Sequence, residues 1–194
     1  MKKFILASTL AIISASTFAA GDNSGLRVGG GFGADIGSNT LSRSTGGDLE
    51  LDPALALEAG YEFNGIFGIN VKGSGTGLSA NQSKSKSTNL GTMYDLSVEA
   101  EAGYTFNLDN GVSIKPYAAV GGVGFDKDTS KLLGFNGKNE VAFKGRGAAG
   151  VRMTLDNGLY VDGRIQATDF SVKGDTVTKD DLLTQGLITV GYKF

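Results

Sequence analysis

Ten charged residues in this sequence recur at even spacings on one face of alternating segments. They are Arg27, Glu58, Glu62, Glu99, Glu101, Lys144, Arg146, Arg152, Asp162 and Arg164. Residues two apart in an extended strand point to the same side, so each group would share one face of its segment. The acids gather in two earlier segments and the bases mostly in two later ones. The chemistry that this pattern favours is pairing of opposite charges.

The residue types that are missing exclude several kinds of site. The 194 residues include no His and no Cys. Ser-His-Asp triads, Cys nucleophiles, zinc sites and haem ligation of the usual kinds therefore cannot form, and we predict no catalytic, cofactor-binding or metal-binding residues. Without residues 1–20, sixteen basic and twenty acidic residues remain, a net charge of −4. This charge is too weak and too evenly mixed to indicate a nucleic-acid partner.

The first 20 residues have the composition of a secretory signal peptide. Lys2 and Lys3 are followed by a mostly apolar stretch over residues 4–15 and by small residues up to Ala20. Cleavage after Ala19 or Ala20 would leave residues 21–194 as one domain. This remainder has no run of 18 apolar residues, so we expect no transmembrane helix in it.

The elements that must position the charges are predicted to be strands. The 31 glycines are more than twice ordinary usage and oppose helix formation. Apolar residues alternate with a period of two in eight segments, which predicts an all-β protein with eight strands. Segment 112–125 is apolar on both faces, so its phase stays open. The segments are 26–36, 49–63, 67–72, 94–106, 112–125, 141–155, 159–168 and 184–194.

The predicted connections are alternately long and short. Residues 63–65, 108–111 and 155–158 are Asn-Gly turns, in which both central residues can adopt positive φ. Four polar stretches, 37–48, 74–91, 126–139 and 170–181, are predicted to be long loops. The heptapeptide at 58–64 recurs at 101–107, each time just before a short turn. This arrangement leaves both chain termini on the side of the short turns.

The alternation alone fits a soluble barrel as well as a membrane barrel. A soluble barrel would place the apolar face inside and the charges outside, whereas a transmembrane barrel reverses this arrangement. The apolar faces are about ten residues long, as a tilted spanning strand requires. Aromatic residues collect near the short turns, where an interfacial girdle would lie. These are Tyr61, Phe63, Phe67, Tyr104, Phe106, Tyr192 and Phe194.

Five features carry a family resemblance: the signal peptide, the eight strands, the Asn-Gly turns, residues 116–121 and the closing residues 191–194. In these features the sequence resembles small Gram-negative outer-membrane barrels. It is most similar to the OmpA-type transmembrane domain and the OmpX/Ail group. The resemblance implies a monomeric, eight-stranded antiparallel up-and-down transmembrane β-barrel, with both termini in the periplasm. It also implies that the last strand is the signal read by the outer-membrane insertion machinery, through Ile188, Val190, Tyr192 and Phe194.

A narrow barrel would force its interior charges to pair, because an unpaired buried charge costs several kcal/mol. We therefore predict a lumen charge cluster that fills the barrel. The alternative is a gated pore in which some pairs rearrange. The predicted members are Glu58, Glu62, Glu99, Glu101, Lys144, Arg146, Arg152 and Arg164.

Two functions remain open at this point. The resemblance favours a non-enzymatic outer-membrane protein that supports envelope integrity or adhesion, with its four extracellular loops contacting a host or surface ligand. The alternative is a small, low-conductance porin. The sequence does not identify a loop ligand.

Overall fold

The computed structural model describes residues 23–36, 41–43, 47–81, 87–109, 111–132, 141–169 and 182–194. The predicted signal peptide and the predicted loop at 170–181 lie outside these residues. Within them, no helix has the length and apolar character needed to span a membrane.

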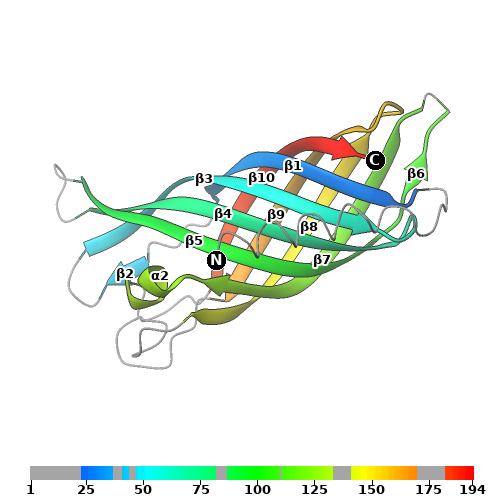
Figure 1. The fold of residues 1–194 in the computed structure, drawn as a ribbon. Coiled ribbons are helices and arrows are strands. Elements are labelled where there is room, and N and C mark those ends of the chain that lie inside the picture. Colours follow the sequence, from blue (N-terminus) through cyan, green and yellow to red (C-terminus); the bar gives the residue numbers. More distant parts are fainter. Residues whose placement is uncertain are drawn as a thin grey trace, which may run out of the picture.

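Ten strands and one short helix make up the described part of the chain (Figure 1). They are β1 (Gly25–Asp35), β2 (Leu41–Arg43), β3 (Gly47–Glu62), β4 (Phe67–Asn81), β5 (Ser87–Gly103), β6 (Phe106–Asn107), β7 (Ser113–Phe125), α2 (Lys127–Leu132), β8 (Ala142–Thr154), β9 (Leu159–Asp169) and β10 (Leu182–Lys193).

All strands except the short β2 and β6 form a closed antiparallel barrel. The sheet runs β1-β10-β9-β8-β7-β5-β4-β3, and β1 also pairs with β3, so the sheet has no free edge there. Val28, for example, is paired with Tyr192 of β10 on one side and with Ala59 of β3 on the other. The predicted eight-stranded antiparallel up-and-down barrel is thus confirmed.

The alternation in the sequence places apolar side chains outside and polar side chains inside. On β3, Leu55 and Leu57 are 74% exposed, whereas Ala54, Ala56 and Glu58 between and beside them are buried. β9 repeats the pattern, with its apolar residues exposed and its charged residues enclosed. This distribution is the reverse of that in a water-soluble barrel.

The phase of β7, which the sequence left open, is now defined. Lys115, Tyr117, Val123 and Phe125 point inward and are buried, whereas Val120 points outward. The sequence was ambiguous because the inner face changes from polar to apolar toward the end of the strand near α2.

The predicted loop at 74–91 is wrong. β4 continues to Asn81, well beyond the predicted 67–72 strand, and β5 begins at Ser87. The two strands remain paired out to Asn81 and Ser87. Ser, Gly and Thr dominate this region, so backbone pairing continues there without the apolar alternation on which the prediction depended.

Two other predicted loops contain regular structure in their described parts. The 37–48 loop includes β2 and the start of β3, which pair with each other. The 126–139 loop begins with α2, and its residues 133–139 lie outside the described ranges.

The Asn-Gly turns are at the predicted places, but their expected backbone conformation is wrong. Gly111 and Gly158 have positive φ, whereas Asn64, Gly65 and Asn157 do not. The loop around Gly158 encloses three residues, because Leu155 N–H donates to the Leu159 carbonyl and Gly158 N–H to the Leu155 carbonyl. A loop of this length needs only one left-handed residue.

Aromatic pairs mark the end of the barrel that carries the short turns. Tyr61–Phe63, Tyr104–Phe106 and Tyr192–Phe194 have ring centroids 5.3, 4.9 and 5.0 Å apart, each in an edge-to-face arrangement. The three pairs lie where β3, β5 and β10 approach the same end. β6 and the C-terminus lie at this end, opposite α2 and β2 (Figure 1).

Gly121 of β7 faces the lumen at a point where the sheet leaves no room for a side chain. A Cβ there would collide with the Val98 carbonyl oxygen and would lie 2.6 Å from the Glu99 Cα, whereas a Cβ on outward-facing Gly147 would meet nothing within 4 Å. We expect Gly121→Ala to lower the free energy of unfolding by about 1–3 kcal/mol. Gly147→Ala, the matched control, should change it by less than about 0.5 kcal/mol. Urea unfolding followed by circular dichroism measures both, and equal effects would contradict this reading.

Candidate functional site

The lumen holds equal numbers of buried acidic and basic side chains. Among the described residues, six acids and six bases that face the lumen are buried. They are Glu58, Glu62, Asp95, Glu99, Glu101 and Asp162, with Arg27, Lys72, Lys115, Arg146, Arg152 and Arg164.

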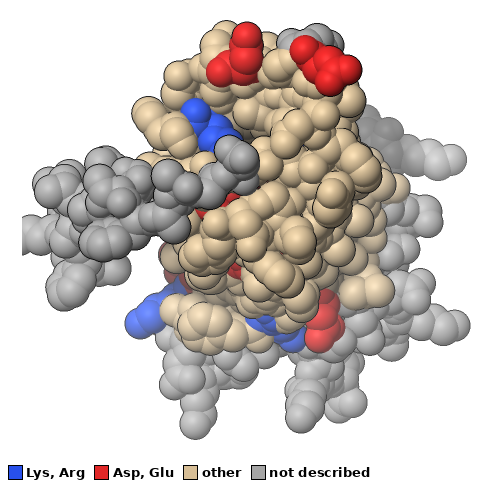
Figure 2. Space-filling view, turned by 90° about the vertical axis from the view of Figure 1, so that its right-hand side faces the viewer, with Lys and Arg blue, Asp and Glu red and all other residues tan. Residues whose placement is uncertain are grey.

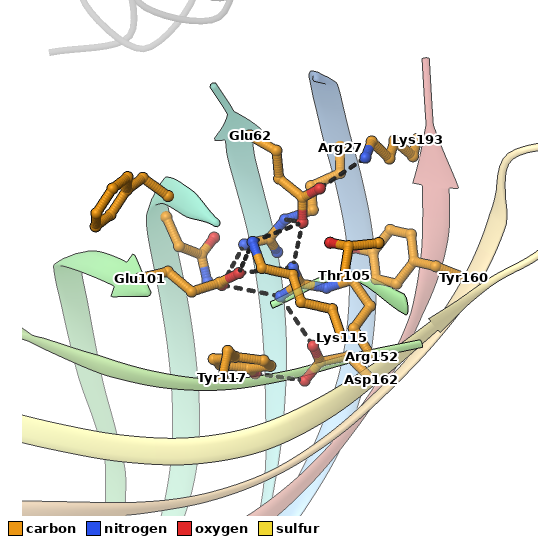
Figure 3. Close-up of polar contacts among 12 residues, drawn as sticks. Arg27, Glu62, Glu101, Thr105, Lys115, Tyr117, Arg152, Tyr160, Asp162 and Lys193 are labelled. Atoms are coloured by element: carbon orange, nitrogen blue, oxygen red, sulfur yellow. Dashed lines mark hydrogen bonds and ion pairs between the residues drawn. The ribbon is translucent and has the colours of Figure 1, made fainter. Parts of the chain in front are cut away.

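Arg152 of β8 is the centre of this arrangement (Figure 3). Its Nη1 lies 2.6 Å from Glu62 Oε1 and 2.8 Å from Glu101 Oε1, and its Nη2 lies 2.9 Å from Asp162 Oδ2. Glu62 is on β3, which lies opposite β8 in the barrel, and Glu101 is on β5, two strands away from β8. One guanidinium therefore bonds strands on opposite walls of the barrel.

Arg27 of β1 provides a second bridge. Its guanidinium is 2.8 Å from Glu101 Oε2 and 3.2 Å from Glu58 Oε1. The residue is 0% exposed, and it lies against Gly60 of β3, where a Cβ would be 2.8 Å from the Arg27 Cζ. The glycine thus makes the space that this arginine occupies.

Lysines complete the pairing around the same carboxylates. Lys115 Nζ lies 3.2 Å from Glu101 Oε1, and Lys72 Nζ lies 3.1 Å from Glu58 Oε2. Lys193 of β10 reaches Glu62 Oε2 at 2.6 Å. Because β1 lies between β10 and β3, this last ion pair connects the two strands that flank β1.

Two tyrosines donate hydrogen bonds to carboxylates of the cluster. The Tyr117 hydroxyl donates to Asp162 Oδ1 and the Tyr160 hydroxyl donates to Glu58 Oε1, both at 2.8 Å. The Arg152 Cζ lies 4.9 Å from the centroid of the Tyr117 ring and 5.9 Å from that of Tyr160. Cation–π contacts with two aromatic rings thus hold the Arg152 guanidinium in addition to its ion pairs.

Two further ion pairs lie closer to the α2 end. Arg164 donates two hydrogen bonds to the Glu99 carboxylate, at 2.8 and 3.0 Å. Arg146 donates to Asp95 Oδ1 at 3.2 Å and to the Thr168 hydroxyl at 2.8 Å. The Ser74 hydroxyl also donates to Asp95.

Nearly the whole sequence matches a known protein family. A family model described as "Outer membrane protein beta-barrel domain" matches residues 5–194. The chain belongs to this family. Membership of this family places the barrel in the outer membrane, where its apolar outer face is in contact with lipid.

One solved structure shows the same fold at low sequence identity, and two others align over most of their length. The outer-membrane barrel is similar to OprG from Pseudomonas aeruginosa, with 16% identity over 88% of this chain and 96% of that chain, at a TM-score of 0.52. Ail from Yersinia pestis has 17% identity over 89% and 100% of the two chains, at a TM-score of 0.45. The outer membrane enzyme PagL has 12% identity over 87% and 99%, at a TM-score of 0.44. A search of curated protein sequences finds no significant match.

Most of the side chains predicted for the lumen cluster do meet in the outer-membrane barrel. Seven of the eight are buried and form the ion pairs described above. Lys144 faces the same side of β8 but is only half-buried, near the α2 end of its strand. Among the described residues, no group of three His, Cys, Asp or Glu side chains could hold a metal ion.

Sequence reasoning missed several members of the cluster. Lys72, Asp95 and Asp162 had the right even spacing, but only the ion-pair geometry shows that they take part. Lys115 and Tyr117 lie on the strand whose phase was open. Of the predicted insertion residues, Ile188, Val190 and Tyr192 are exposed on the outer face of β10, and Phe194 is exposed just after its last residue.

Few of these charges reach the surface at the end with the short turns. Figure 2 looks onto this end and shows mostly uncharged residues, with charged side chains in small separate groups. The charged residues of the strands thus lie chiefly inside the barrel, and what their arrangement can do is fill the lumen and hold opposite walls together.

Proposed function

We propose that this protein is a non-enzymatic, monomeric outer-membrane barrel whose lumen is closed and whose role is structural and at the cell surface. The observation that carries the proposal is the buried, charge-balanced cluster centred on Arg152. Its side chains form ion pairs at 2.6–3.2 Å, so each of its carboxylates faces a basic side chain across the lumen or along the wall. The absence of His and Cys from the sequence supports a role other than catalysis.

A closed lumen has a direct electrical consequence. In planar bilayers the purified barrel is expected to produce no reproducible single-channel steps, because the paired side chains leave no continuous aqueous path. An established porin, inserted under the same conditions, is the control for the recording. Stable steps of uniform size from pure protein would overturn the closed barrel and favour the small porin instead.

The surface role would be carried by the long loops, which the barrel holds at its α2 end. We propose that these loops support adhesion or envelope integrity, and that residues 1–20 direct export. We further propose that the outer face of β10, with Ile188, Val190, Tyr192 and Phe194, is read by the insertion machinery. Replacing residues 170–181 by a short Asn-Gly turn tests the first point, because it should reduce cell adherence or envelope resistance while the barrel still folds.

A further inference from the structure

Near α2 the inner face of the barrel carries a group of buried apolar side chains beside the Arg146–Asp95 ion pair. Six apolar side chains in this half of the lumen are buried: Met93, Val123, Phe125, Ala142, Leu183 and Leu187. They come from β5, β7, β8 and β10. The mouth of a barrel on the side of its long loops opens toward water, so apolar side chains that line it must be covered to stay dry.

The segment 126–132 folds back at this mouth and is held by two hydroxyl groups. Tyr94 N–H of β5 donates to the Thr129 hydroxyl at 3.3 Å, and Ala142 N–H of β8 donates to the Ser130 hydroxyl at 3.1 Å. Thr129 and Ser130 are both buried. Because β5 and β8 flank β7, the two hydroxyls fasten α2 on both sides of the strand from which it emerges.

The attachments of α2 are much weaker than those of the charge cluster. The helix has only six residues. Within the described part of the chain, the hydrogen bonds that join segment 126–132 to β5 and β8 are these two and one from Asp126 N–H to the Tyr94 carbonyl. The cluster, in contrast, is a network of buried ion pairs across the lumen. Segments with few tertiary bonds open locally at low free-energy cost, whereas a buried charge network opens only at high cost.

We propose that α2 is a lid over the extracellular mouth of the lumen, latched by Thr129 and Ser130, and that the lid and the charge cluster are two independent seals in series. Opening of the lid admits solutes from outside only to the part of the lumen that Val123 and Phe125 line. The charge cluster still closes the path to the periplasm. The inference extends the proposed closed barrel by stating which end can open.

The chain has no cysteine, so single cysteines report access without background. Val123→Cys would report on the upper lumen, Ala119→Cys on the lumen deeper along β7, and Lys127→Cys on the exposed surface of α2. Intact cells that display each variant are treated with a small, charged, membrane-impermeant thiol reagent. In the otherwise unchanged protein, Lys127→Cys should be modified quickly, and the other two slowly.

Releasing the latch should change one reporter only. Combined with Thr129→Val and Ser130→Ala, Val123→Cys is expected to react at least about tenfold faster, because two hydrogen bonds that hold the lid are lost. Ala119→Cys should stay protected. Thr92→Val, which removes an exposed hydroxyl on β5, is the matched control and should leave every rate unchanged. Retained heat-modifiability on gels verifies that each variant is folded.

Three results would overturn the proposal. An unchanged Val123→Cys rate after release of the latch would show that α2 is not the lid. Equal acceleration of Ala119→Cys would show one seal rather than two. Rapid modification of Val123→Cys with the latch intact would show an open mouth. None of these results depends on the bilayer recordings, in which steps from the unchanged protein would instead contradict the closed barrel.

Discussion

Arg152→Ala is expected to lower the free energy of unfolding of the barrel by about 3–5 kcal/mol, because the change removes one partner from a buried charge network. Glu62 keeps Lys193 at 2.6 Å, and Glu101 keeps Arg27 at 2.8 Å. Asp162, in contrast, loses its one basic partner among the described ion pairs, which is Arg152. It keeps the hydrogen bond from the Tyr117 hydroxyl.

A second substitution identifies the source of this loss. Asp162→Asn removes the carboxylate charge that Arg152→Ala leaves buried, so the double variant should be more stable than Arg152→Ala alone. In the presence of Arg152 the same substitution should be destabilising. This reversal of sign is the signature of a charge pair in a double-mutant cycle.

The measurement is urea unfolding in lipid vesicles, followed by circular dichroism or by the gel shift on boiling, because the chain has no Trp to provide a fluorescence signal. Lys144→Ala on the same strand is the control. Since Lys144 is half-buried, its removal should cost less than about 1 kcal/mol. Unfolding of Arg152→Ala at the midpoint of the unchanged protein would contradict the buried cluster.

The ion pairs of the cluster differ in whether they need closure of the barrel. Arg27–Glu58, Lys72–Glu58 and Lys115–Glu101 join strands that pair directly and follow one another along the chain. Arg152–Glu62 and Lys193–Glu62 instead join β3 to β8 and to β10, which come much later in the chain. These two pairs form only when the late strands meet the early ones, so they stabilise the closed barrel rather than individual hairpins.

The spacing of residues was sufficient to predict the wall of the barrel and the side of each charge. A period of two places Glu99 with Glu101 on the inner face of β5 and Arg146 with Arg152 on that of β8, and only strands can produce it. The spacing could not predict which acid meets which base. That depends on the stagger between strands, through which Arg152 reaches Glu62 on the far wall rather than a neighbour on β7.

The elements that the sequence did not predict, the ends of β4 and β5 and the helix α2, have a common physical cause. β4 and β5 extend past the apolar band into residues 74–81 and 87–91, where backbone pairing continues the ladder without an apolar alternation in the sequence. α2 is short and is positioned by Thr129 and Ser130, whose role depends on N–H groups of distant strands. Side-chain periodicity carries no information about either kind of bond. Strands predicted from it therefore end where the apolar band ends.

Val120→Arg on the outer wall is expected to destabilise the barrel by about 2–4 kcal/mol in lipid, because the side chain would enter the hydrocarbon core. Val120 is 70% exposed, lies near the middle of β7, and is flanked on neighbouring strands by Ala100 and Gly147. These small neighbours cannot shield a guanidinium from the acyl chains. In a protein surrounded by water, the same exposed substitution would change stability by no more than about 0.5 kcal/mol.

Val141→Arg provides the matched control, because Val141 is exposed just before β8 at the α2 end, near the edge of the apolar band. Its substitution should cost no more than about 1 kcal/mol. Urea unfolding of both variants in lipid vesicles gives the comparison, and the gel shift shows how much of each is folded in cells. Equal, small effects at the two positions would mean that water rather than lipid surrounds the middle of β7. A large effect at Val120 alone would place the boundary of the hydrocarbon core between the two residues, because the same Val→Arg change is made at two exposed positions of the outer wall.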